Sequence, residues 1–193
     1  MSEKSGKNLP DCSVFCGVSL DGFLAKPNGD LDWMEGPGEG DAGAGDHGYQ
    51  AFVSGIDTLV WGRKTFEKVM TFDKWYHGDK RVVVLSSKPL DLALARERGG
   101  HVEQMSGPPA EVAARLGAGG SKHLYIDGGL TCQAFLRAGL IQRLIISQLP
   151  ILLGQGIPLF GPLNQDVRLK LVSSRVYPGG MVQSEYQVLS NEH

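Results

Sequence analysis

The sequence predicts a three-layer α/β/α fold, with a mixed, mainly parallel sheet between helices and an antiparallel hairpin at the C-terminal end. Short β-branched apolar runs alternate with amphipathic segments along most of the chain, which is typical of a sheet covered by helices. The pattern then changes to two alternating runs around residues 177–180, which indicates a hairpin with a short turn. We expect a single domain over residues 11–190, after a flexible leader at 1–10.

The expected strands are short runs rich in β-branched residues and bounded by turn formers. In chain order they span residues 12–20, 57–62, 80–87, 101–105, 122–126 and 142–154, and the hairpin follows at 167–189. The helical segments between the earlier strands favour parallel neighbours, because a parallel pair needs a long crossover connection.

The expected helices are identified by their amphipathic period and by the residues at their ends. They span residues 49–55, 63–72, 90–100, 107–120 and 129–140. Gly55 ends the first helix, and the second begins near Lys64 and Thr65. The fourth has proline at its start and glycine at its end, the usual asymmetry of helix termini.

A long loop and a Gly-rich segment separate the first strand from the first helix. The loop, residues 21–33, contains several turn formers and an apolar patch at 23–25. The following residues are rich in glycine and acidic side chains, and 43–48 match the dinucleotide-binding pattern G-x-G-x-x-G. That pattern requires a strand directly before it, and the preceding residues cannot form one, so we interpret the match as a decoy.

Composition and charge exclude several classes of function. The net charge is −2, so there is no basic footprint for nucleic acid or an anionic membrane. No apolar run approaches the ~20 residues that span a bilayer, and no signal peptide is recognisable, so we expect a cytoplasmic protein. Cys12, Cys16 and Cys132 are interpreted as reduced thiols. No His/Cys spacing indicates a metal.

The turn after the second expected strand carries groups suited to an anion. Arg63, Lys64 and Thr65 follow Gly62 at the start of a helix. Cations at a helix N-terminus oppose the helix dipole unless an anion is bound there. A phosphate site is therefore the more economical interpretation, and a solvated surface turn is the alternative.

Two further turns repeat this theme. Residues 86–88, Ser-Ser-Lys, follow the third strand, and Gly128-Gly129 lie between an expected strand and helix. Each could be an ordinary tight turn. However, ligands of open α/β sheets bind at the carboxyl ends of the strands. Three anion-friendly turns on that edge favour an extended ligand with several phosphates.

The motifs SLDGFLAKPNGDLDW, VWGRKTFE, VVLSSKP, YIDGG and ILLGQGIPLF occur in this order. Together they resemble the dihydrofolate reductase-like superfamily, especially the branch of the reductase domain of the bifunctional riboflavin-biosynthesis deaminase-reductase and its stand-alone relatives. The resemblance covers nearly the whole chain, from about residue 12 to 189. It implies a dihydrofolate reductase-like fold, NADPH as hydride donor and a homodimer.

The resemblance also assigns expected roles to particular positions. The residues expected to bind NADPH are Gly17, Leu24, Ala25, Gly62, Arg63, Lys64, Thr65, Ser86, Ser87, Lys88, Gly128, Gly129, Leu130 and Thr131. Arg63 would bind the 2′-phosphate. Ser19, Trp33 and Asp127 would face the substrate, and Phe23 and Leu24 would form a flap that excludes water.

The catalytic proton donor stays open at this stage. Asp21, Asp46 and Asp127 are the candidate carboxylates, and spacing does not choose among them. A bound water is the alternative donor. The implied activity is an NADPH-dependent reduction of a pyrimidine or pterin-like small molecule, foremost 5-amino-6-(5-phosphoribosylamino)uracil. No arginine lies between Trp33 and Arg63, where the riboflavin enzyme holds its substrate phosphate. The alternatives are a dihydrofolate reductase-like enzyme on another substrate, or a dinucleotide- or folate-binding protein without this activity.

Overall fold

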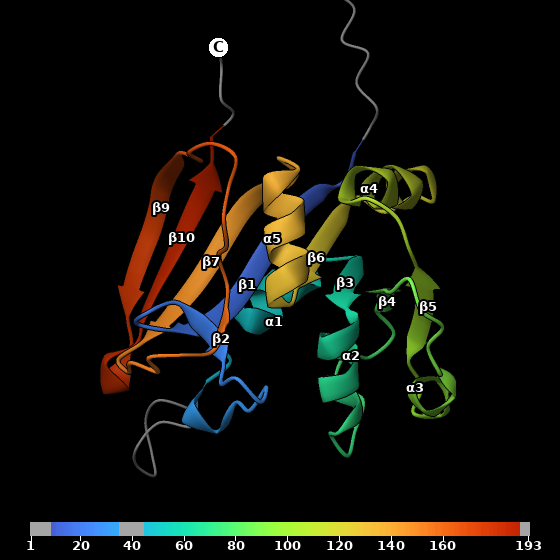
Figure 1. The fold of residues 1–193 in the computed structure, drawn as a ribbon, viewed down its shortest axis with the longest axis horizontal. Helices are drawn as coiled ribbons and strands as arrows, with labels where there is room; N and C mark the ends of the chain where they lie inside the picture. The colour runs from blue at the N-terminus through green and yellow to red at the C-terminus, as the bar shows by residue number, and fades with distance from the viewer. Residues whose placement is uncertain (1–8, 35–44, 190–193) are drawn as a thin grey trace, which may run out of the picture.

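An eight-stranded sheet forms the centre of the computed structural model, which describes residues 9–34 and 45–189 (Figure 1). Its strands are β1 (Asp11–Ser19), β3 (Thr58–Gly62), β4 (Arg81–Leu85), β5 (His101–Met105), β6 (His123–Asp127), β7 (Ile141–Leu149), β9 (Leu169–Val176) and β10 (Val182–Val188). Across the sheet the order is β5-β4-β3-β6-β1-β7-β10-β9. β10 pairs antiparallel with β7 and β9, and the pairs among the other strands are parallel.

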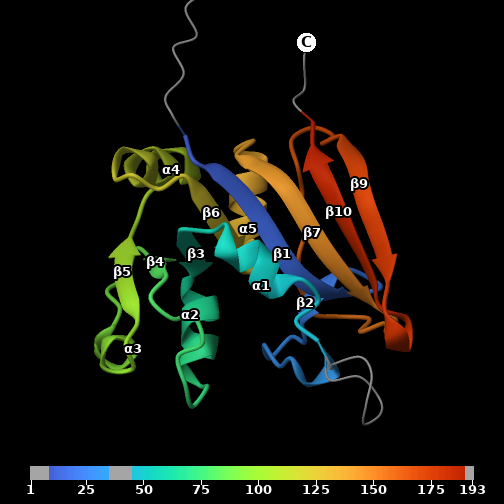
Figure 2. The same cartoon turned by 180° about the vertical axis from the view of Figure 1, so that it is seen from behind.

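Helices cover both faces of the sheet, as Figures 1 and 2 show from opposite sides. The helices are α1 (Tyr49–Ser54), α2 (Arg63–Met70), α3 (Ala93–Glu97), α4 (Pro109–Ala118) and α5 (Gly129–Arg137). Successive residues of a strand point to opposite faces of the sheet, so they contribute to two hydrophobic cores. Val60 and Ile126 pack with side chains of α4 and α5, whereas Leu59 and Tyr125 pack with side chains of α1, α2 and α3. The expected three-layer fold with a C-terminal hairpin is confirmed.

The structure differs from expectation in the loop after β1. Residues 23–25 form a short strand, β2 (Phe23–Ala25), which pairs antiparallel with β8 (Ile157–Pro158). The structure also differs from expectation at the end of β7. The expected strand over 142–154 stops at Leu149, because Pro150 has no N–H to continue a ladder. The chain then turns back and carries β8 to β2.

Parts of the expected organisation lie outside the described residues. These include most of the leader, at 1–8, and the Gly-rich segment from 35 to 44. Within the described ranges, no helix has the length and apolar character needed to cross a membrane.

Candidate active site

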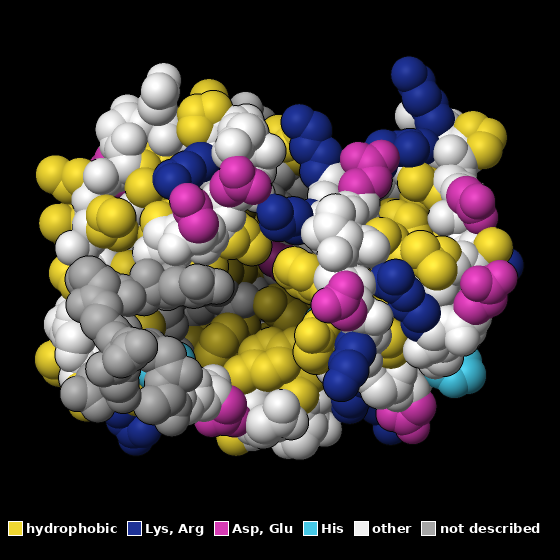
Figure 3. All heavy atoms as spheres, turned by 90° about the horizontal axis from the view of Figure 1, so that it is seen from below, with side chains coloured by type: hydrophobic (Ala, Val, Ile, Leu, Met, Phe, Trp, Pro, Cys, Tyr) yellow, Lys and Arg dark blue, Asp and Glu magenta, His cyan; other side chains and the backbone are white. Residues whose placement is uncertain are grey.

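The three anion-friendly turns meet on one edge of the sheet. β4, β3, β6 and β1 are neighbours and run parallel, so their carboxyl ends point the same way. Gly62 lies beside Leu85 in the register of β3 and β4, and Trp61 lies beside Asp127 in that of β3 and β6. Figure 3 looks onto this edge and shows a hollow near the middle of the face, with hydrophobic side chains at its bottom.

The first turns of α2 and α5 interlock at this edge. Gly128 has a φ of +97°, and a Cβ on it would overlap the Thr65 hydroxyl of α2. A Cβ on Gly62 would lie 2.7 Å from Oγ1 of Thr131, in α5. Each glycine therefore leaves the space that the threonine of the other helix fills. Because the first N–H groups of a helix have no partner within the helix, two sets of backbone donors are brought together for an anionic ligand.

Arg63 joins the first turn of α2 to the turn after β4. Its Nε and Nη2 donate to Oγ of Ser86 at 3.1 and 2.9 Å, and Nη2 also donates to the carbonyl oxygens of Lys88 and Pro89 at 2.8 and 2.9 Å. Nη1 lies 3.4 Å from Oε1 of Glu67. The guanidinium thus holds the 86–89 turn against α2.

Several other residues of the three turns are exposed. Lys64, Ser87 and Lys88 are open to solvent at the same edge, and Leu130 is 72% exposed at the start of α5. An extended ligand that crosses from the 86–88 turn to α5 would pass all of them. The expected cofactor positions of α2, α5 and the β4 turn therefore lie at one edge of the sheet, with Gly129 and Thr131 buried there.

Asp127 ends β6 at the centre of the edge and is partly buried. Its Oδ1 accepts the N–H of Gly128 at 2.8 Å. Burial nevertheless raises the pKa of this carboxyl to about 6. A carboxyl with a pKa near neutrality can hold and release a proton at physiological pH.

Two tyrosines near Asp127 escaped the sequence analysis. Burial, followed by the charge of Asp127, raises the pKa of the phenols of Tyr49 and Tyr125. Tyr125 donates its hydroxyl to the carbonyl of Phe15 at 2.7 Å. Tyr49 opens α1, directly after the Gly-rich segment, so no motif in the sequence places it beside the end of β6.

The other candidate carboxylates have structural partners. Asp21 accepts the hydroxyl of Ser19 at 2.6 Å, together with backbone N–H groups of residues 153 and 154. Asp46 accepts the N–H groups of Gly48 and Gln50 at 3.1 and 2.7 Å, at the start of α1. These hydrogen bonds hold the pKa of both carboxyls below the ordinary value. Asp127 is therefore the carboxyl of the three that is suited to donate a proton near neutral pH.

The positions expected around the nicotinamide and the substrate lie beside β1. A Cβ on Gly17 would come within 3.6 Å of Cε of Met34, the residue after Trp33 in a 3-10 turn. Trp33 is buried, and its indole N–H has no acceptor among the described residues. Leu24 and Ala25 lie in β2. Ser19 is fully buried, and its hydroxyl also accepts the N–H of Phe23 at 2.9 Å.

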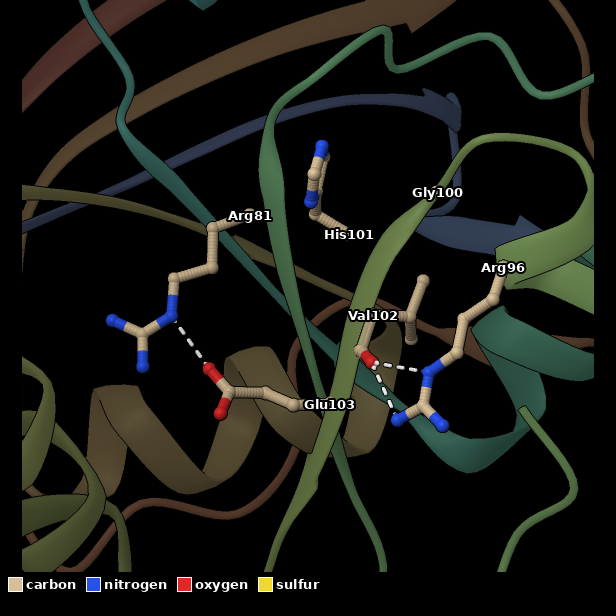
Figure 4. Close-up of a pocket in the computed structure, with 6 residues that line it drawn as sticks. All are labelled: Arg81, Arg96, Gly100, His101, Val102 and Glu103. Atoms are coloured by element: carbon tan, nitrogen blue, oxygen red, sulfur yellow. Dashed lines mark hydrogen bonds and ion pairs between the residues drawn. The ribbon is translucent and has the colours of Figure 1, made fainter. Parts of the chain in front are cut away.

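A separate pocket lies at the amino ends of β4 and β5, away from this edge (Figure 4). Its charged groups pair within the protein. Arg81 binds Glu103 at 2.5 Å, and Arg96 donates to the carbonyl of Val102 at 3.2 and 3.4 Å. This pocket offers no group comparable to Asp127 or to the helix N-termini.

The fold and this edge define a dihydrofolate reductase-like domain. The family model of the RibD C-terminal domain matches residues 12–183. The uncharacterized protein YwjB of Bacillus subtilis is 31% identical over 175 residues, which cover 90% of this chain and 95% of YwjB. The chain belongs to the RibD C-terminal domain family.

Solved structures of other proteins share this fold. A putative riboflavin biosynthesis protein from a Shewanella species is 35% identical with a TM-score of 0.84, over 93% of this chain and 99% of that one. Dihydrofolate reductase from Enterococcus faecalis, solved with NADP(H), shares the fold at 17% identity and a TM-score of 0.64, over 93% and 97% of the two chains. Membership of this family supports an oxidoreductase, a reductase of the kind that acts in riboflavin biosynthesis.

Proposed function

We propose that the protein is an NADPH-dependent reductase of a pyrimidine or pterin-like substrate. The observation that carries this proposal is the interlocking of the α2 and α5 N-termini through Gly62, Thr65, Gly128 and Thr131. It creates a surface of backbone donors beside Arg63, which suits a dinucleotide with several phosphates.

The residues fit NADPH along the whole edge. The first turn of α5 would hold the pyrophosphate, and that of α2 would hold the adenosine phosphates, with Arg63 at the 2′-phosphate. The turn at 86–88 would lie beside the adenosine. Gly17, Leu24 and Ala25 would surround the nicotinamide, since they line the β1 and β2 side of the same edge.

The bound cofactor would supply the hydride, and the chain would supply orientation, a dry environment and a proton. Asp127 is the residue proposed to hold that proton, because its raised pKa keeps a substantial protonated fraction near neutral pH. The unpaired indole N–H of Trp33 would donate to an acceptor on the substrate. A planar nitrogen heterocycle with carbonyl groups matches this set of donors.

The substrate proposed first is 5-amino-6-(5-phosphoribosylamino)uracil, the compound named for the reductase half of a Thermotoga maritima relative of the same fold. One observation favours a second candidate. Residues 34–62 contain no lysine or arginine but include Glu35, Glu39, Asp41 and Asp46. A pyrimidine or pterin-like substrate without a phosphate would need no cation from this stretch of the sequence.

A pair of assays tests the proposed function. Saturable NADPH binding, followed by quenching of tryptophan fluorescence, tests the cofactor. Steady-state oxidation of NADPH with the aminouracil, with and without its phosphate, and with dihydrofolate tests the substrate. Binding without turnover of any of these compounds would favour a dinucleotide-binding protein over a reductase. A lack of NADPH binding would refute the proposal.

We also propose that the protein forms a homodimer through its hairpin. β9 is the outer strand of the sheet (Figures 1 and 2). Leu171, Val172 and Val176 on it are 54%, 55% and 72% exposed. Large apolar side chains on a free edge strand are unusual in a monomer. A second copy of the same hairpin would cover them.

A further inference from the structure

Residues 150–161, the first part of the segment between β7 and the C-terminal hairpin and here called the arm, contact several parts of the candidate site. Leu20 donates its N–H to the carbonyl of Ile151 at 2.8 Å, and Leu159 donates to the carbonyl of Gly22 at 3.0 Å. Nε2 of the buried Gln133, in α5, donates to the carbonyl of Pro158 at 3.0 Å. The arm is therefore hydrogen-bonded both to the residue after β1 and to α5, the helix whose first turn is proposed to hold the pyrophosphate.

The arm also places β8 beside β2 and against the first turn of α5. A Cβ on Gly129 would lie 2.8 Å from the carbonyl oxygen of Pro158, 3.3 Å from Ile157 and 3.4 Å from Cδ1 of Leu24. β2, β8 and the first turn of α5 thus pack at van der Waals distance. A shift of the arm would move Leu24 relative to the helix N-terminus.

Asp21 fastens the arm to β1. Its Oδ1 accepts the Ser19 hydroxyl at 2.6 Å and the N–H of Leu153 at 3.1 Å, and its Oδ2 accepts the N–H of Gly154 at 2.7 Å. Ser19 in turn accepts the N–H of Phe23, the first residue of β2. One carboxylate therefore connects the start of β2 to the arm that packs against it.

We propose that Asp21 is a positioning residue that holds the arm, and through it β2, against the first turn of α5. This inference rests on the proposed NADPH-dependent function. It assigns Asp21 to the nicotinamide half of the site, where β2 lies. The adenosine half, formed by α2 and the 86–89 turn, has no hydrogen bond to the arm among the described residues.

The test compares two carboxylates with the same kind of partners. Asp21→Asn keeps the size of the side chain but replaces one acceptor oxygen with an NH₂ group that meets a backbone N–H. Asp57→Asn is the matched control. Asp57 also accepts one hydroxyl, from Thr58, and two backbone N–H groups, from Lys122 and His123, but at the opposite edge of the sheet.

Comparing the affinity for NADPH with the affinity for its fragment 2′,5′-ADP separates a positioning role of Asp21 from general destabilisation. Asp21→Asn should weaken NADPH by about tenfold, the scale of one lost charge-assisted hydrogen bond. It should leave the affinity for 2′,5′-ADP unchanged, because that fragment occupies only the adenosine half. Asp57→Asn should leave both affinities unchanged. Equal weakening of both ligands by Asp21→Asn, or no change in NADPH affinity, would overturn the proposal.

Amide hydrogen exchange supplies a readout that needs no cofactor. In Asp21→Asn, the N–H groups of residues 153, 154 and 159 should exchange faster than in the wild type, and those of α2 should not. If the wild type does not bind NADPH, the proposed function fails, and unchanged exchange in the arm would additionally refute its attachment by Asp21. Ser19→Ala, which removes only the hydroxyl, should give the same pattern in a milder form if Asp21→Asn does not fold.

Discussion

Replacement of Arg63 by alanine should reduce the affinity for NADPH much more than the affinity for NADH. The guanidinium already donates to Ser86, Lys88 and Pro89, so its loss has two effects. It removes a charged ligand of the 2′-phosphate, and it releases the 86–89 turn. Only the first effect distinguishes the two cofactors, because both share the adenosine that the turn would contact.

The magnitude follows from the contacts that remain available. Nη1 has a single partner, Glu67, at 3.4 Å, so it is the atom of Arg63 best placed to bind a phosphate oxygen. A charge-assisted hydrogen bond contributes about 1.5–3 kcal/mol. The ratio of NADPH to NADH affinity should therefore fall roughly 10- to 150-fold, since about 1.4 kcal/mol corresponds to a factor of ten.

Titration calorimetry with both cofactors measures this ratio directly. Arg63→Lys should give an intermediate value, because lysine keeps the charge but cannot form the same fork to the turn. Glu67→Gln is the matched control and should raise the ratio, because it removes a negative charge next to Nη1. An equal loss of both cofactors in Arg63→Ala would refute the assignment of Arg63 to the 2′-phosphate.

Three other predictions concern the glycine turn, the buried carboxyl and the hairpin. Gly128→Ala should lower the free energy of unfolding by more than the ~1 kcal/mol cost of its positive φ, since its Cβ overlaps Thr65, and should abolish NADPH binding. Gly139→Ala, at φ +67° with open space around it, should show the φ cost alone in the same denaturation experiment. Folding raises the pKa of Asp127 from 3.8 to about 6, so the folded state binds this proton more tightly than the unfolded state. The stability of the wild type relative to Asp127→Asn should therefore decrease as the pH rises from 3.8 to about 6, and it should be constant above that pH. Reductase activity should fall as the pH rises above 6. A stability difference that does not change with pH would contradict the raised pKa of Asp127. Leu171→Lys should convert a dimer into a monomer in sedimentation velocity, and an unchanged dimer would place the interface elsewhere.

Most of the sheet was predictable because its signals are local. β3, β4 and β6 are short β-branched runs followed by turns, and each could be placed from residues close in sequence. The carboxyl-edge location of Gly62, Ser86 and Gly128 followed from the parallel arrangement alone. The role proposed for Arg63 needed the family resemblance, because charge and position could not distinguish a phosphate ligand from a surface turn.

The parts that escaped prediction depend on contacts between distant residues. β2 and β8 are too short to show a period, and they pair across more than half the chain. The raised pKa of Asp127 results from burial that only the packed structure supplies. Two of the three partners of Asp21 are the backbone N–H groups of Leu153 and Gly154, which no side-chain pattern reveals. A carboxylate in a loop could have a catalytic role or a positioning role, and only its contacts in the folded structure distinguish these roles.

The most direct test of the proposed cofactor site is an NADPH titration followed by backbone amide NMR. Saturable shifts should concentrate at the interlocked turns, 62–65 and 128–131, and at 86–88, while the amides around the Arg81 pocket at the opposite edge stay unchanged. Saturable binding that shifts the opposite edge instead, or no binding at submillimolar NADPH, would contradict the assignment of this edge to the cofactor.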